Sequence, residues 1–123
     1  MESKGVCLDT DVLIDSFKGD PREIRGYHVT CISLYEFLRG LAYLGKDVNE
    51  FKAWIEANMN VVCVDNKAIK TASRIYAELR REGNLIEDPD LLIASMCIAN
   101  GLVLKTGNRK HFERLEKFGL KLV

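Results

Sequence analysis

The chain has 123 residues, of which 47% are hydrophobic and 29% are charged, and its formal net charge at pH 7 is zero. This profile is typical of one soluble globular domain over residues 1–123 and excludes a disordered chain. The neutral charge gives no sign of a nucleic-acid binder, although a local basic patch can accompany an acidic pocket.

Apolar runs alternate with amphipathic stretches along the whole chain. Strands are predicted at residues 5–9, 27–32, 60–64, 102–104 and 120–123. Helices are predicted at residues 11–18, 33–44, 47–58, 66–82, 88–100 and 108–118. Continuously apolar strands that alternate with helices indicate a parallel sheet covered on both faces. We therefore predict an α/β fold, a three-layer α/β/α sandwich around a parallel sheet of four to five strands.

The N-terminal residues lack the profile of a signal peptide, and no apolar run approaches the ~20 residues of a membrane span. We therefore expect a cytoplasmic protein that does not enter a membrane. The four cysteines lie in apolar stretches and form no Cys-x-x-Cys pair, which favours free, buried thiols over structural zinc. They are Cys7, Cys31, Cys63 and Cys97.

Two acids, Asp9 and Asp11, follow the first predicted strand where the next helix begins. In open α/β sheets, ligands bind outside the carboxyl ends of the strands. An unpartnered carboxylate at the position of Asp9 would be costly to desolvate, so we favour a functional role for it. Asp11 has a structural alternative as a helix N-cap, and Asp15 is expected to be a solvated helix residue.

Three further acids lie at the start of other predicted helices. Ser33 and Glu36 match a capping box, but the same geometry points the Glu36 carboxylate at the carboxyl edge of the second strand. Asp88 would cap the helix that Asp90 enters, with Pro89 at its first position. Because that helix is apolar nearly all round, it should be buried, and Asp90 then needs a hydrogen-bond partner, a cation or a raised pKa.

Three or more carboxylates that converge on one point repel one another unless a cation lies among them. Hard divalent cations favour carboxylate and water ligands, and Mg²⁺ keeps several waters. No histidine cluster competes for zinc, since His28 lies in a predicted strand and His111 is expected to pack or to lie at the surface. The acids therefore point to a divalent-metal site.

Four blocks, in this order and at these spacings, resemble the PIN-domain family, most closely the VapC-type toxin ribonucleases of toxin–antitoxin pairs. The blocks are Leu8–Asp15, Ser33–Gly40, Asp88–Ala94 and Gly101–Phe112. The resemblance covers nearly the whole chain. It implies Mg²⁺- or Mn²⁺-dependent hydrolysis of RNA, a homodimer, and a small antitoxin partner that occludes the acidic site.

The resemblance also implies roles for individual residues. Asp9, Glu36 and Asp90 match the family's acidic metal ligands and would carry catalysis. Asn108 stands where many members have a fourth Asp, so a second metal site would be weakened. The auxiliary positions are Thr10, Asp11, Asp88, Thr106 and Asn108. Phosphate contacts, or ordinary solvated charges, are expected at Arg39, Lys105, Arg109 and Lys110.

Three other interpretations stay open at this point. Asp9 and Asp11 fit the strand-end motif of a haloacid-dehalogenase-type phosphatase. A receiver-like phosphorylated signalling module would bind Mg²⁺ at the same acids, accept phosphate at Asp65 and sense it with Lys105. The third is an inactive PIN-like scaffold, which Asn108 suggests.

The predicted helices 33–44 and 47–58 carry more large apolar residues than one short helical pair must bury. These residues are Leu41, Tyr43, Leu44, Phe51 and Trp54. An exposed patch there would suit a dimer or an antitoxin, whereas the alternative is core packing, and the sequence does not choose between them.

Overall fold

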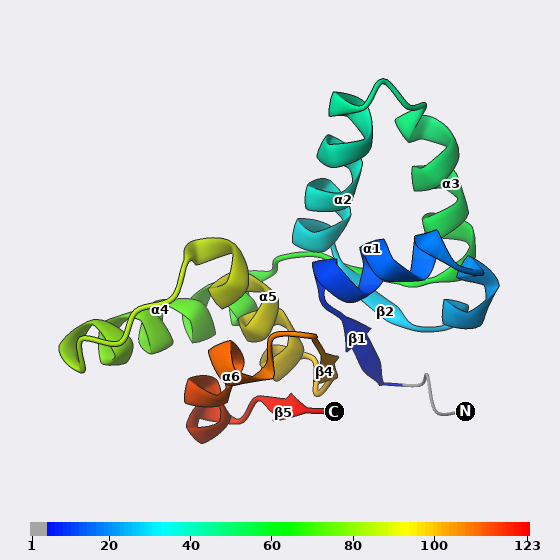
Figure 1. Cartoon of the computed structure of the whole chain (residues 1–123). Helices are drawn as coiled ribbons and strands as arrows, with labels where there is room; N and C mark the ends of the chain where they lie inside the picture. Colours follow the sequence, from blue (N-terminus) through cyan, green and yellow to red (C-terminus); the bar gives the residue numbers. More distant parts are fainter. Residues whose placement is uncertain (1–4) are drawn as a thin grey trace.

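The computed structural model describes residues 5–123 and contains a five-stranded parallel sheet (Figure 1). The strands are β1 (Val6–Leu8), β2 (His28–Thr30), β3 (Asn60–Val62), β4 (Val103–Lys105) and β5 (Lys121–Leu122). They lie in the order β3-β2-β1-β4-β5. The chain first builds the sheet to one side of β1 and then crosses to β4 on the other side. The carboxyl ends of β1 and β4 therefore flank a topological switch point, where open sheets form ligand-binding crevices.

The helices form the two outer layers of the molecule. The α-helices are α1 (Thr10–Lys18), α2 (Cys31–Tyr43), α3 (Val48–Asn58), α4 (Asn66–Arg81), α5 (Asp88–Ala99) and α6 (Arg109–Phe112). Two 3₁₀-helices, η1 (Pro21–Ile24) and η2 (Glu113–Phe118), complete the described part. None of the helices within residues 5–123 has the length and apolar character that crossing a membrane requires.

The two faces of the sheet are covered by different helices. The first three helices, α1 to α3, lie on one side of β1, and α4 to α6 lie on the other side (Figure 1). Neighbouring side chains of a strand point to opposite faces, so Cys7 packs with α4 and α5 whereas Leu8 packs with α1, α2 and α3. The predicted three-layer α/β/α sandwich is confirmed.

An aromatic cluster joins the helices of one outer layer. The Phe17 ring centroid lies 4.9 Å from that of Phe37, 5.8 Å from that of Phe51 and 5.4 Å from that of Trp54. Such tilted and edge-on pairs each contribute about 0.5–1.5 kcal/mol beyond the area that they bury. Core packing therefore accounts for Phe51 and Trp54, two of the large apolar residues that the sequence left unassigned.

Helix α2 begins two residues earlier than the sequence predicts. Thr30, the last residue of β2, is its N-cap, and the Thr30 hydroxyl accepts the backbone N–H of Ser33 at 3.1 Å. Cys31 and Ile32, predicted as strand residues, therefore lie in the first turn of the helix. The predicted capping box of Ser33 and Glu36 is wrong, because the buried Thr30 cap starts the helix at Cys31 and outweighs the strand preference of the β-branched Ile32.

Two other helix boundaries also differ from the prediction. Glu87 rather than Asp88 is the N-cap of α5, so Pro89 occupies the second helical position, where its missing N–H is equally harmless. The predicted helix 108–118 is a short α6 followed by the 3₁₀ segment η2, which Gly119 ends with a φ of 104°. The 3₁₀-helix η1 was not predicted.

The four cysteines are free, as predicted, but they are not all buried. Cys7 and Cys97 are buried and Cys31 is half-buried. Cys63 is exposed because it follows β3, an edge strand whose outer side has no neighbour in the sheet. The prediction of a buried thiol is wrong for this residue.

Removal of the Thr30 hydroxyl should destabilise the fold by about 1–2 kcal/mol, because the substitution takes away a helix cap at a fully buried position. Thr30→Val removes the hydroxyl at nearly constant shape, and Thr71→Val on α4 is the matched control. Urea denaturation of both variants measures the difference. Equal stability of the two variants would show that Thr30 is not the cap.

Candidate functional site

A cavity of about 370 Å³ opens at the carboxyl end of β1. Its lining contains four acids and one cation among residues from α1, α2, α5 and the segment before α6. The lining residues are Asp9, Thr10, Asp11, Ile14, Glu36, Arg39, Asp90 and Asn108. The parallel topology therefore brings Asp9, Glu36 and Asp90 to one cavity from three separate parts of the chain.

Asp9 is the most buried of these acids, with 7% of its surface exposed. Its Oδ1 accepts the backbone N–H of Thr10 at 2.8 Å, which makes Asp9 the N-cap of α1. Its Oδ2 accepts the hydroxyl of Thr106 at 2.8 Å. Burial raises the pKa of Asp9, although the hydrogen bond from Thr106 opposes this rise. The negative charges of Asp11 and Asp90 raise the pKa further.

A chain of hydroxyl groups holds Glu36. The Thr10 hydroxyl donates to Oε1 of Glu36 at 2.6 Å, and the hydroxyl oxygens of Thr10 and Ser33 lie 2.9 Å apart. Thr10 has a single hydroxyl proton and an ionised carboxylate can only accept, so Ser33 donates to Thr10. The hydroxyl of Thr30 in turn donates to Ser33 at 3.4 Å. Glu36 is thus oriented from α1 and from the end of β2.

Asp90 projects from the first turn of α5, and its Oδ2 lies 2.9 Å from Nε2 of His111. Burial raises the pKa of Asp90, and the hydrogen bond and charge of His111 act in the opposite direction. The negative charge of Glu36 raises the pKa of Asp90 further.

Sequence reasoning missed His111, which was expected to pack or to lie at the surface. It faces an acid of the cavity, since its Nε2 lies within hydrogen-bond distance of Asp90. The available signal was its position three residues after Asn108, in the block that follows the fourth strand. Ser33 was also assigned only as a cap, although it supports Glu36 through Thr10.

Asp11 connects α1 to the segment after β4. Its Oδ1 accepts the N–H of Val12 at 2.8 Å, and its Oδ2 accepts the N–H of Gly107 at 3.0 Å. Asp11 does not cap α1, because Asp9 occupies that position. A Cβ atom on residue 107 would lie 2.5 Å from Oδ2 of Asp11, so a larger residue there would displace the exposed Asp11 carboxylate from this hydrogen bond.

The other predicted site residues are distributed unevenly around the cavity. Arg39 lines it, and its Nη2 lies 3.8 Å from Oε2 of Glu36. Asn108 also lines it and makes no side-chain capping bond to α6. Three basic residues are exposed outside the lining, namely Lys105, Arg109 and Lys110.

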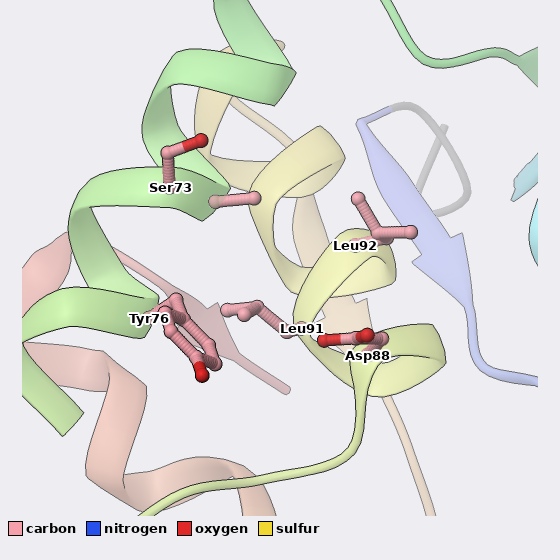
Figure 2. Close-up of a pocket in the computed structure, with 6 residues that line it drawn as sticks. Ser73, Tyr76, Asp88, Leu91 and Leu92 are labelled. Carbon is pink, nitrogen blue, oxygen red and sulfur yellow. The ribbon is translucent and has the colours of Figure 1, made fainter. Parts of the chain in front are cut away.

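Asp88 lies outside the acidic cavity. It lines a separate cavity of about 360 Å³ between α4 and α5, where Tyr76 and Leu91 point toward one another (Figure 2). Asp88 is the one acid among the residues that line this cavity, and a single carboxylate does not create a metal site. The structure therefore does not bring Asp88 together with the other predicted acids.

The chemistry of the acidic cavity fits a hard divalent cation. Its donors are carboxylate, hydroxyl and amide oxygens, which Mg²⁺ and Mn²⁺ prefer. Within residues 5–123, however, no three Asp, Glu, His or Cys side chains are arranged to hold one ion directly. The acids were predicted to converge on a single point, whereas in the structure they line one cavity without doing so. Water molecules would therefore complete the coordination of an ion.

The fold agrees with the comparisons to known proteins. The PIN domain family matches residues 6–117. The chain is 40% identical to Ribonuclease VapC1 of Methanocaldococcus jannaschii over 98% of this chain and 88% of that protein. It is 28% identical to the tRNA(fMet)-specific endonuclease VapC of Shigella flexneri over 88% of this chain and 89% of that protein. It also matches DNA-bound VapBC from Salmonella typhimurium with a TM-score of 0.78, 27% identity, and coverage of 98% and 97%.

The chain therefore belongs to the PIN-domain family, and the predicted resemblance is confirmed. Within this family, the relatives that match it along most of its length are VapC ribonucleases. The receiver interpretation is wrong, because receivers have the strand order 2-1-3-4-5, whereas β3 is an edge strand here. Asp65 is the N-cap of α4 beyond that edge strand and is absent from the acidic cavity.

Substitution of Gly107 by alanine should destabilise the protein by about 0.5–1.5 kcal/mol, because the added methyl group would push the exposed Asp11 carboxylate off its hydrogen bond to the N–H of residue 107. In an Asp11→Ala background the same substitution should cost much less, and a double-mutant cycle from urea denaturation measures this coupling. Gly40→Ala is the control, since nothing lies near the new methyl group and alanine should stabilise α2 by about 0.5–1 kcal/mol. Equal costs of Gly107→Ala in both backgrounds would contradict the contact.

Asp90→Asn should make the metal-free protein more stable at neutral pH. Because the pKa of Asp90 is raised in the folded state, folding favours the protonated carboxyl group. The contribution of Asp90 to stability is therefore complete below its ordinary pKa of 3.8 and is lost as the pH rises through the raised pKa of the folded state. The melting temperature of the variant should therefore exceed that of the wild type at about pH 7, and the two should converge near pH 3. Circular dichroism in EDTA measures both, with the exposed Asp15→Asn as control. A variant less stable than wild type at neutral pH would contradict the assignment.

Proposed function

We propose that this chain is a divalent-metal-dependent endoribonuclease that hydrolyses RNA phosphodiester bonds and acts as the toxin of a toxin–antitoxin pair. The observation that carries the proposal is the group of four carboxylates that line one cavity at the switch point of the sheet. Relatives named ribonuclease and endonuclease match most of the chain and support the same activity. This agrees with the enzyme class that the sequence predicts.

Asp9, Glu36 and Asp90 would hold Mg²⁺ or Mn²⁺, in part through water. When bound, the ion lowers the pKa of a coordinated water and stabilises negative charge on the phosphate. Asp9 and Asp90 have raised pKa values because they are buried near other carboxylates. Binding of a cation would offset this repulsion and allow the RNA backbone to enter.

Polar groups beside the acids would position the RNA. The guanidinium of Arg39 lines the cavity and is suited to a bidentate contact with a phosphate. The amide of Asn108 would orient a phosphate oxygen or a water without adding charge. The exposed side chains of Lys105, Arg109 and Lys110 would contact phosphates farther along the strand.

An apolar groove beside the acidic cavity supports the proposal of an antitoxin partner. It has a volume of about 340 Å³ and lies between α1, α2 and α3. Its apolar lining consists of Ile14, Phe17, Phe37, Leu41, Leu44 and Phe51. Ile14 also lines the acidic cavity, so the groove and the cavity adjoin. An apolar antitoxin segment in the groove would lie beside the acids and obstruct RNA, and a solved VapBC complex among the structural matches supports a protein partner.

Three further properties remain proposals that rest on the similarity to VapC-type toxins. Residues 1–123 would form one nuclease domain, since the family match extends over most of them. The protein would act as a homodimer. It would be located in the cytoplasm, where an RNA-cleaving toxin meets its substrates.

Purified protein should cleave RNA in the presence of Mg²⁺ or Mn²⁺ and should lose this activity in EDTA. Asp9→Asn, Glu36→Gln and Asp90→Asn should each lower the cleavage rate at least ~100-fold, because each removes a charged ligand. Denaturing gels of an end-labelled RNA measure the rates, and Asp15→Asn should retain wild-type activity.

Equal cleavage by the wild type and Asp90→Asn would remove Asp90 from the site, and cleavage that survives EDTA would exclude a metal-dependent reaction. A folded protein that cleaves no RNA with either metal would support the inactive PIN-like scaffold. A trapped aspartyl-phosphate at Asp9 would instead support the phosphatase interpretation.

A further inference from the structure

Each proposed metal ligand receives a hydrogen bond from a side chain in another part of the chain. Thr106 donates to Asp9, and Thr10 donates to Glu36. For Asp90 the partner is His111, whose Nε2 lies 2.9 Å from Oδ2. The first two donors are neutral hydroxyl groups, so His111 stands out as the one donor that carries an imidazole.

His111 lies beside the cavity without lining it. Asp90 is one of the lining residues and His111 is not, which places the imidazole at the flank of the carboxylate. The side chain of His111 is 25% exposed and that of Asp90 is 32% exposed. This geometry suits a group that orients the acid and does not suit a direct ligand of an ion in the cavity.

The backbone and ring of His111 are held from several sides. Its N–H donates to the carbonyl of Asn108 at 3.1 Å, and its own carbonyl accepts Nε of Arg114 at 3.0 Å. Its ring lies edge-on to Phe112, with 5.3 Å between the centroids, and Phe112 is fully buried. The imidazole is therefore pre-organised, which limits the entropy that would be lost on fixing Asp90.

We propose that His111 is a positioning residue, which donates from Nε2 to Oδ2 of Asp90 and directs the other carboxylate oxygen, Oδ1, toward a divalent cation in the acidic cavity. Within residues 5–123 no group hydrogen-bonds to Oδ1, so that oxygen is available. Partners that orient metal ligands typically contribute 10- to 100-fold to metal affinity. The inference rests on the proposed metal-dependent function.

Two variants at the same position separate the hydrogen bond from other roles. His111→Leu removes the donor, whereas His111→Gln places an amide N–H at about the reach of Nε2. Titration of the RNA-free protein with Mn²⁺, followed by the electron paramagnetic resonance signal of free Mn²⁺, measures the affinity directly. We expect about a tenfold loss for His111→Leu and an affinity within about threefold of wild type for His111→Gln. Glu113→Leu, an exposed neighbour, is the control for a leucine on this segment and should bind like wild type.

A double-mutant cycle with Asp90→Asn completes the test. If His111 acts through Asp90, His111→Leu should cause no further loss of Mn²⁺ affinity in the Asp90→Asn background. The cycle also detects a folding defect in His111→Leu, because such a defect would lower Mn²⁺ affinity in both backgrounds. A loss of affinity in both backgrounds would contradict the proposal.

The outcomes distinguish this inference from the proposed function. Wild-type affinity in His111→Leu, or an equal loss in the Leu and Gln variants, overturns the positioning role and leaves the metal site intact. A wild-type protein that binds no Mn²⁺ overturns the metal-dependent function itself, and the positioning role with it.

Discussion

A buried carboxylate, Asp9, is the constraint on which this edge of the sheet depends. A charge at the end of the central strand is costly to remove from water unless hydrogen bonds replace the lost solvation. The N–H of Thr10 and the hydroxyl of Thr106 provide them, and these donors follow two adjacent strands, β1 and β4. The partners of one acid therefore connect the two halves of the sheet at its switch point.

The other acids of the cavity follow the same physical rule. Each belongs to one helix and is oriented by a donor from another part of the chain, as Glu36 is by Thr10 and Asp11 is by Gly107. Such donors restrict a carboxylate without neutralising it, so the negative charge remains available. A hard cation is the partner that offsets that charge, and this links the fold to hydrolysis of phosphodiester bonds.

Helix α1 connects this chemistry to the apolar face of the molecule. Its first turn borders the acids, whereas Phe17 near its other end packs in the aromatic cluster with α2 and α3. Ile14 lies between them and lines both the acidic cavity and the apolar groove. A partner that fills the groove would therefore act on the same helix that positions Thr10 and Glu36.

The sequence by itself determined the parallel α/β/α architecture and predicted three acids that line one cavity, because apolar periodicity and helix-start acids are local signals. It could not determine which residues meet across elements. The partner of Asp90 proved to be His111, and Asp88 proved to line another cavity. These outcomes depend on the packing of α5 against α4 and α6, and on which buried polar group finds a donor in space. Local pattern sets the elements and their acids, whereas tertiary packing decides the hydrogen-bond partners, because those partners are far apart in the chain.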